Sequence, residues 1–268
     1  MALKIKITVR LLNFYSYSLN NYSLVLGNIM RIKLALKCNS GIFIPFNYNA
    51  KINAMILDKI KLADVEYAEQ IHNGRSFKFF TFSNLIIPNR QIDAARGGLI
   101  VKSNEINLII SSPDKKFAHA FLAGIVQDPL VNIGGVKLVF ESMNIIDDPD
   151  FSSGILTFKT LTPIITSTKK EVEGVLKKWD LTPKDIHFYS NIRNNIIKKY
   201  IAFNGILQDD RFNLSTIKLL NTKRISVKNT FHVGNMGIFK MSGTPQLLEF
   251  AYNCGLGERN SMGFGMVG

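Results

Sequence analysis

The chain has 268 residues, enough for one large core or for two domains of about 100 to 150 residues each. Its formal net charge of +13 favours a polyanionic partner, nucleic acid foremost, and the lack of an apolar run of 18 or more residues argues against a membrane span or a membrane partner. The two cysteines, Cys38 and Cys254, have neither disulfide nor zinc-site spacing, so we expect a reducing, cytoplasmic setting and no metal site.

Residues 30–147 predict a first α+β domain. Alternating apolar residues predict a strand over 31–37, and helical spacing predicts a helix from Asn49 and a short second helix that stops at Asn73-Gly74. Then come an aromatic and β-branched segment over 77–87 with a strand beginning near Lys78, a hairpin of 98–101 with 106–110, a helix over 117–125 and a strand over 136–146. This order is that of a ferredoxin-like, or RRM-like, unit.

Residues 147–154 predict a linker, because acids, a proline and small residues cannot build a core. The second domain then spans 148–268. Its expected elements are a strand over 155–165, a helix from Thr182-Pro183 with Ile186 on its apolar stripe, strands over 224–228 and 237–241 around 231–235, and a helix from Thr244 to Cys254. The fold class expected is therefore α+β, with tandem ferredoxin-like domains and antiparallel sheets.

Residues 1–29 carry no signal peptide, because they lack a compact apolar core with a cleavage site. We expect an N-terminal extension there, and both a genuine extra element and an over-long reading frame fit it.

Five glycines crowd the C-terminus in Gly255-Leu-Gly-Glu-Arg-Asn-Ser-Met-Gly-Phe-Gly-Met-Val-Gly268. The last six residues spell a dinucleotide-binding pattern, but that motif requires a strand before it and a helix after it, so no nucleotide cofactor is expected. A helix C-cap explains Gly255 alone. The remaining glycines suggest a loop whose bare backbone approaches phosphates.

This glycine-rich stretch resembles the C-terminal signature of the CRISPR repeat-processing endoribonucleases, nucleases of the RAMP superfamily that mature guide RNA. The similarity covers residues 30–267 and includes Ile44-Pro-Phe-Asn-Tyr48, Ile71-His-Asn-Gly74 and Lys78-Phe-Phe-Thr-Phe-Ser83. It implies a metal-independent cleavage of CRISPR repeat RNA by the 2′-hydroxyl, which leaves 5′-hydroxyl and 2′,3′-cyclic phosphate ends.

The resemblance also implies site residues. His72, at the end of a helix, corresponds to the catalytic histidine, and Lys78 corresponds to a supporting lysine. The family often has a tyrosine on the first helix where this chain has Leu57, and Tyr48 or Tyr67 could replace it, although packing explains each tyrosine better. The expected RNA-binding residues are Gly255, Gly257, Arg259, Asn260, Ser261, Gly263, Gly265, Lys223, Arg224, Lys228 and His232.

The expected partners are CRISPR repeat RNA or the guide-RNA precursor, with subunits of a CRISPR effector complex and a second copy of the chain left open. A competing interpretation is a non-catalytic RNA-binding RAMP subunit of such a complex. The basic pairs at 115–116, 169–170, 177–178, 198–199 and 223–224 are each best explained as solvated surface, so only the total charge is informative.

Overall fold

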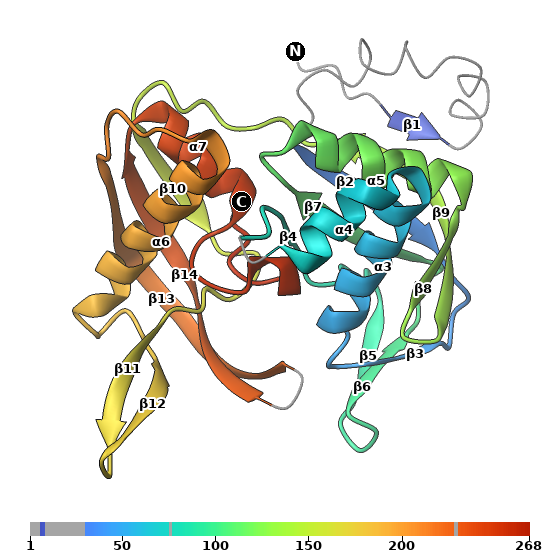
Figure 1. Cartoon of the computed structure of the whole chain (residues 1–268). Coiled ribbons are helices and arrows are strands. Elements are labelled where there is room, and N and C mark those ends of the chain that lie inside the picture. The colour runs from blue at the N-terminus through green and yellow to red at the C-terminus, as the bar shows by residue number, and fades with distance from the viewer. Residues whose placement is uncertain (1–5, 9–29, 75–76, 228–229) are drawn as a thin grey trace. The chain divides into compact units, whose positions relative to one another are not determined.

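A computed structural model describes residues 6–8, 30–74, 77–227 and 230–268 (Figure 1). The chain divides into two compact units, one built from residues up to 75 together with 84–147, the other from 76–83 together with 148–268. Both are mixed α+β units in which every strand pair described is antiparallel, which confirms the predicted α+β class with antiparallel sheets. The segment 76–83 belongs to the second unit, so the chain enters that unit before the expected linker.

The first unit is built on a sheet whose strands neighbour in the order β9 (Val136–Ile145), β2 (Arg31–Lys37) and β7 (Glu105–Ser111). Strands β8 (Leu130–Ile133) and β1 (Lys6–Thr8) also pair with β9, and Ile86 forms a bridge with Asn107 of β7. The predicted strands over 31–37 and 136–146 are thus confirmed within a residue.

Helices α3 (Asn49–Ala63), α4 (Val65–Asn73) and α5 (Lys115–Gln127) cover one face of this sheet (Figure 1). All three were predicted from apolar spacing. Helices α3 and α5 approach closely because residue 124 is glycine: a Cβ there would lie 1.7 Å from the carbonyl oxygen of Lys59. The core between helices and sheet includes Leu34, Leu36, Ile52, Ile56, Leu108 and Phe121, each essentially inaccessible.

The predicted hairpin of 98–101 with 106–110 is wrong. Strand β6 (Gly98–Val101) pairs instead with β3 (Phe43–Pro45) and β5 (Arg90–Asp93), whereas β7 pairs with β2. The connecting residues turn away because the backbone N–H groups of Lys102 and Ser103 donate to the carbonyl of Asn89. The connection also lacks the glycine that a tight hairpin turn requires.

The second unit has a sheet in the order β10 (Ile155–Lys159), β14 (Thr230–Gly243) and β13 (Phe212–Val227), and Val267 near the C-terminus bridges to Thr160 beside β10. Helices α6 (His187–Asn204) and α7 (Pro245–Cys254) pack on it. Helix α7 begins as predicted, because Thr244 Oγ1 accepts a hydrogen bond from the N–H of Leu247 and Pro245 occupies the first turn.

Several expectations for the second unit are corrected. The strands expected over 224–228 and 237–241 belong to one long hairpin, β13–β14, in which residues 231–235 are part of β14. The strand expected over 155–165 ends at Lys159. A further hairpin, β11 (Ser167–Val172) with β12 (Val175–Asp180), was not predicted.

Helix α6 begins at His187 and not at Thr182. The backbone N–H and the hydroxyl of Thr182 both donate to Asp185 Oδ2, at 2.7 and 2.9 Å, and this local turn precedes the helix. Ile186, expected on the apolar stripe, is 85% exposed as a result.

Candidate functional site

His72 lies in the last turn of α4, in the first unit, and its side chain is exposed. The helix is positioned by Asp64, which precedes it and whose carboxylate accepts a hydrogen bond from the N–H of Tyr67 at 2.9 Å. His72 Nδ1 lies 3.0 Å from Asn73 Oδ1. Because an amide oxygen only accepts, this contact requires a proton on Nδ1, and in the neutral ring Nε2 is then a free lone pair that can act as a base.

Lys78 lies in the second unit, on the segment 76–83, so the chain passes from one unit to the other between the two predicted catalytic residues. The segment is fixed by the residues after Lys78. Phe79 packs edge-on against Phe203 at 5.0 Å between ring centroids, and Thr81 Oγ1 donates to the carbonyl of Phe264 at 3.0 Å. A short strand, β4 (Thr81–Phe82), is all that remains of the strand expected from Lys78 onward.

Tyr48 and Tyr67, the two tyrosines that could replace the one missing at Leu57, are both buried. Tyr48 Oη accepts a hydrogen bond from the N–H of Leu85 at 3.2 Å. Tyr67 Oη donates to Asp114 Oδ2 at 2.5 Å, and burial, reinforced by that carboxylate, raises the pKa of Tyr67 well above its ordinary value. These contacts favour the packing role for both side chains.

The glycine-rich loop continues directly from α7 and contains a short 3₁₀ helix, η1 (Asn260–Met262). Its backbone has positive φ at Gly255 (86°), Gly257 (71°), Arg259 (59°), Gly263 (76°) and Gly265 (71°). Only glycine adopts such angles without strain, which explains why glycine recurs in this stretch of the sequence.

The protein's own backbone, however, explains why glycine is required at two of these positions. A Cβ at Gly257 would lie 2.3 Å from the carbonyl oxygen of Ile165, and one at Gly265 would lie 1.9 Å from that of Leu256. Gly257 therefore has a structural reason to lack a side chain, because the side chain would point into the protein. The approach of phosphates to this residue stays a prediction.

A buried lysine holds this loop, and sequence reasoning did not single it out. Lys199 of α6 is 3% exposed, and its Nζ donates to the carbonyl of Gly257 at 2.7 Å and to Asn260 Oδ1 at 2.5 Å. The amide nitrogen of Asn260 in turn donates to the carbonyls of Leu256 and Phe264, both at 3.0 Å. Lys199 follows Ile192 and Ile196 along the buried stripe of α6. A lysine at an apolar position of a helix is the sequence pattern that could have indicated a buried, hydrogen-bonded ammonium.

Three further residues of the loop, Glu258, Arg259 and Ser261, are less deeply buried than its glycines at positive φ. Glu258 accepts hydrogen bonds from the N–H and hydroxyl of Ser167 and from Lys178 Nζ, all between 2.6 and 2.8 Å. Burial alone would raise the pKa of Glu258, but Lys178 and Ser167 outweigh it and lower the pKa. Arg259 and Ser261 are half-buried, and Arg259 Nε has no hydrogen-bond partner among the described residues.

The β13–β14 hairpin presents Lys223 and Arg224 to solvent, and the guanidinium of Arg224 lies 4.5 Å from the ring centroid of Phe231, itself 59% exposed. Lys228 lies outside the described residues. His232 is 2% exposed and its Nδ1 lies 3.4 Å from Asp180 Oδ1, so the protein encloses the ring, and its contact with RNA stays a prediction.

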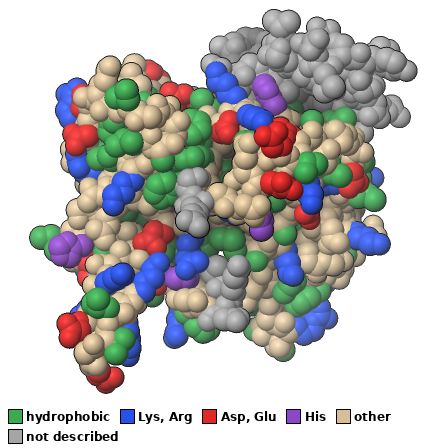
Figure 2. Space-filling model, viewed as in Figure 1, with side chains coloured by type: hydrophobic (Ala, Val, Ile, Leu, Met, Phe, Trp, Pro, Cys, Tyr) green, Lys and Arg blue, Asp and Glu red, His purple; other side chains and the backbone are tan. Residues whose placement is uncertain are grey.

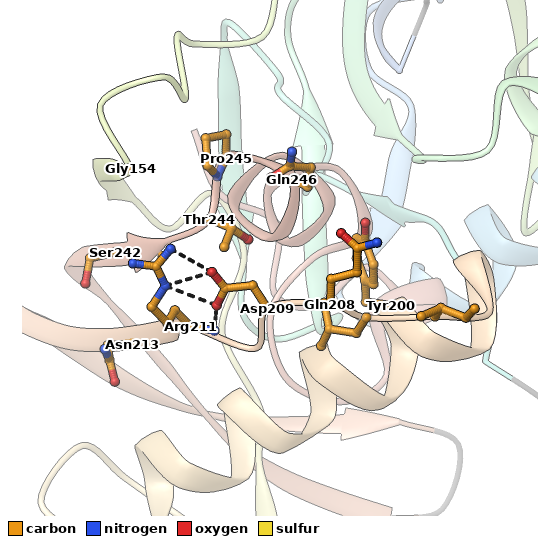
Figure 3. A pocket seen from close by; sticks show the side chains of 13 residues that line it. Gly154, Tyr200, Gln208, Asp209, Arg211, Asn213, Ser242, Thr244, Pro245 and Gln246 are labelled. Carbon is orange, nitrogen blue, oxygen red and sulfur yellow. Dashed lines mark hydrogen bonds and ion pairs between the residues drawn. The ribbon is translucent and has the colours of Figure 1, made fainter.

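A separate pocket of about 790 Å³ opens in the second unit between the end of α6 and the start of α7 (Figure 3). Its charged residues neutralise each other, because Arg211 Nε lies 2.8 Å and its Nη2 2.6 Å from Asp209 Oδ2. None of the predicted site residues lines it. Within the described part of the chain, no three His, Cys, Asp or Glu side chains gather as metal ligands, and no helix is both long and apolar enough to cross a membrane.

Comparison with known proteins decides the family. Residues 43–144 match the CRISPR-associated protein Cas6 N-terminal family, and residues 146–268 match the Cas6 C-terminal family. The CRISPR-associated endoribonuclease Cas6 1 of Methanocaldococcus jannaschii is 38% identical over 89% of this chain and 92% of its own length. The chain belongs to the Cas6 family.

Solved structures of Cas6 proteins agree with this assignment. A Cas6-related protein of Pyrococcus furiosus superposes with a TM-score of 0.80 at 29% identity, covering 90% of this chain and 98% of that one. A second structure of a CRISPR-associated Cas6 protein gives 0.76 at 36% identity over 89% and 98%. The resemblance inferred from the glycine-rich stretch is thereby confirmed.

Proposed function

We propose that this Cas6 chain is a metal-independent endoribonuclease that cleaves CRISPR repeat RNA by attack of a 2′-hydroxyl on the adjacent phosphate. The observation that carries the proposal is the exposed imidazole of His72 at the end of α4, with Nδ1 beside Asn73 and Nε2 able to exchange a proton. The 38% identical relative in Methanocaldococcus jannaschii is named an endoribonuclease, which supports the same activity.

RNA supplies its own nucleophile, so the protein has to move two protons and stabilise charge. The 2′-hydroxyl loses its proton to a base as its oxygen bonds to phosphorus, and the bond to the 5′-oxygen breaks as that oxygen is protonated. A histidine can take either part, because one ring nitrogen can accept a proton and the other can donate one. The products are a 2′,3′-cyclic phosphate and a 5′-hydroxyl, and no step requires a metal ion.

In this mechanism Lys78 provides a positive charge for the phosphorane. An ammonium that is held in place stabilises the extra negative charge without reorganising, which is the usual source of large electrostatic effects in catalysis. The anchoring of residues 79–82 by Phe203 and Phe264 supports this part for Lys78, because it fixes the backbone beside the lysine.

For RNA binding we propose the exposed cations Lys223 and Arg224 on β13, together with the half-buried Arg259 of the glycine-rich loop. The ring of Phe231 beneath Arg224 adds a surface on which a base can stack. A RAMP protein of known structure that is 28% identical, with a TM-score of 0.78, is described as binding different RNA substrates, which supports an RNA partner here.

The test is single-turnover cleavage of repeat RNA in the presence of a chelator. His72→Ala should slow the chemical step by about 100- to 10,000-fold, the usual effect of losing one general acid or base. His187→Ala is the matched control, since His187 is also exposed and lies on α6 of the other unit.

Cleavage by His72→Ala within about threefold of the wild-type rate would place the catalyst elsewhere, since a general acid or base contributes far more. A repeat with a 2′-deoxy nucleotide before the scissile phosphate should remain uncut. Its cleavage, or a strict need for magnesium, would contradict the 2′-hydroxyl mechanism.

A non-catalytic RNA-binding subunit is the second candidate, and one observation favours it. Leu57 stands where the family often has a tyrosine, and Tyr48 and Tyr67 are engaged in packing. A 30% identical Cas6 protein of Pyrococcus furiosus is described only as endoribonuclease-like. Tight binding of repeat RNA without cleavage under all conditions would support this candidate.

We also infer that both units are ferredoxin-like domains, over 30–147 and 148–268, with 76–83 contributed to the second. In that fold the fourth strand lies beside the first and the third beside the second, giving the order 4-1-3-2. The order Val267, β10, β14, β13 supports this for the second unit, and β9, β2, β7 and the bridge at Ile86 support it for the first.

A further inference from the structure

The hairpin β11–β12 projects from the second unit and carries four lysines and the only tryptophan of the chain (Figures 1 and 2). Its register pairs Thr168 with Trp179, Lys170 with Lys177, and Lys169 with Lys178. Directly opposed residues of an antiparallel pair share one face of the hairpin, and successive residues alternate between faces. Two faces of different chemistry follow from this register.

One face, which we call the lysine–tryptophan face, presents Lys170, Lys177 and Trp179, and none of its paired positions is acidic. The Nζ of Lys170 lies 4.9 Å from the centroid of the Trp179 ring, and Trp179 is 48% exposed. The opposite face carries Asp180 and Glu171 on either side of its lysine pair, and Lys178 there is bound to Glu258 at 2.7 Å. Acids therefore balance the lysine charges on the opposite face, whereas no acid at a paired position balances them on the lysine–tryptophan face.

An acid that Lys170 influences lies on the chain after the hairpin. It is Asp185, whose pKa is lowered first by the N–H and hydroxyl of Thr182 and only further by Lys170 and His187. Its carboxylate is therefore already occupied by Thr182. Lys170 and Lys177 remain exposed beside the indole ring.

Two successive lysine pairs facing each other across a hairpin are unfavourable for folding, because like charges directly opposed repel. Natural sequences that break a local folding rule do so most often at functional sites. An anionic ligand on the lysine–tryptophan face would relieve the repulsion between Lys170 and Lys177.

The hairpin is attached to both segments already proposed to bind RNA. Glu258 of the glycine-rich loop holds its base through Ser167 and Lys178. On the other strand, Asp180 Oδ2 accepts a hydrogen bond from the N–H of Val233 in β14 at 2.7 Å. Loop, long hairpin and short hairpin therefore form one connected region of the second unit.

We propose that the lysine–tryptophan face binds a single-stranded segment of RNA, with a base stacked on Trp179 and phosphates on Lys170 and Lys177. A basic surface with an exposed aromatic ring is the usual design for binding unpaired nucleotides, because every base has a face that stacks. The inference rests on the RNA-binding part of the proposed function and is independent of cleavage.

Because Trp179 is the chain's only tryptophan, its fluorescence reports this face alone. The full-length protein is titrated with fluorescein-labelled decauridylate, and anisotropy of the label measures binding while indole emission measures stacking. Wild-type protein should show saturable quenching that parallels the anisotropy. Trp179→Ala should weaken binding by about 5- to 100-fold, the usual effect of losing one stacking ring.

Charge variants separate the two faces. Lys170→Gln combined with Lys177→Gln should reduce the slope of log affinity against log salt by about 1.4, since each phosphate contact on a single strand contributes about 0.7. Lys169→Gln, on the opposite face, is the matched control and should leave affinity within about twofold, because a charge that meets no phosphate releases no counterion. Melting temperatures at or above the wild-type value would show that the variants fold.

Three outcomes would overturn the proposal: no binding of the RNA by wild-type protein, binding without any change in Trp179 emission, or equal weakening by Lys169→Gln and by the double variant of Lys170 and Lys177. If the hairpin variants all bind RNA normally, Trp179 with the exposed Val175 and Leu176 serves a protein surface and the RNA assignment is wrong. Quenching without cleavage of repeat RNA would contradict the nuclease proposal alone, whereas cleavage without quenching would contradict this one alone.

Discussion

The glycine-rich loop and the β11–β12 hairpin lie in the same unit and are joined through Glu258, yet their environments are opposite. In the loop, Gly255, Gly257, Asn260 and Gly265 are buried and bound to the protein itself. In the hairpin, Lys170, Lys177 and Trp179 are exposed and face solvent. The segment with the strongest sequence signature is the more structural of the two.

This difference shows what a sequence signature measures. Glycines at positive φ mark a backbone that must take one shape, and here that shape is imposed by the carbonyls of Ile165 and Leu256. Lysines carry no such mark, because a lysine pair on any exposed strand has the same composition whether or not it binds RNA. If the loop contributes stability and the cations contribute binding, loop variants should lose unfolding free energy and cation variants should lose RNA affinity.

The largest effect is expected from Gly257→Ala. The new Cβ would combine the strain of φ 71° with an approach of 2.3 Å to the carbonyl of Ile165, at a cost of about 3 to 5 kcal/mol in the free energy of unfolding. Gly174→Ala is the matched control, since Gly174 has φ 74° with nothing within 4 Å, and it should cost about 1 to 2 kcal/mol. Equal losses in urea unfolding would show that the backbone angle, and not the packing, makes glycine necessary.

Lys199→Met should destabilise the protein by about 2 to 4 kcal/mol, because it leaves the carbonyl of Gly257 and Asn260 Oδ1 buried without a donor. Lys198→Met, at the exposed neighbouring position, should change stability little. Urea unfolding of both variants measures the difference, and similar losses would mean that Lys199 does not hold the loop.

The same pair of variants predicts a pH dependence. Burial lowers the pKa of Lys199 below its ordinary value of 10.5, so between the folded and the unfolded pKa the unfolded chain binds more protons. The stability of wild type relative to Lys199→Met should therefore rise as the pH increases through that interval. A relative stability that falls toward alkaline pH would mean that the charged form is the one favoured in the folded state.

The smallest effect concerns RNA binding by the loop. Arg259→Ala should reduce the salt slope of repeat-RNA affinity by about 0.7 to 0.9, the value of one phosphate contact. Arg211→Ala is the control, because its guanidinium is held by Asp209. If Arg259→Ala left the salt slope of RNA affinity unchanged, the loop would serve only the stability of the fold. The loop and the hairpin would then differ completely in what they contribute.

Much of the fold follows from local patterns in the sequence. Alternation located β2 and β9, apolar spacing located α3, α4, α5 and α7, and Thr244 with Pro245 marked the start of α7. The motifs around His72 and the last glycines also sufficed to indicate the Cas6 family. Each of these signals depends on a residue's own conformational preference or on neighbours within one turn of helix or strand.

The remaining features depend on partners far along the chain. Pairing of β6 with β3, the transfer of residues 76–83 to the second unit, and the burial of Lys199 and His232 are set by contacts with segments from 52 to 183 residues away, such as that of Thr81 with Phe264. Whether a lysine is a buried donor like Lys199 or an exposed cation like Lys177 is decided by what packs around it. The sequence determined which residues are candidates for binding or cutting RNA, and tertiary packing decided which of these candidates remain accessible.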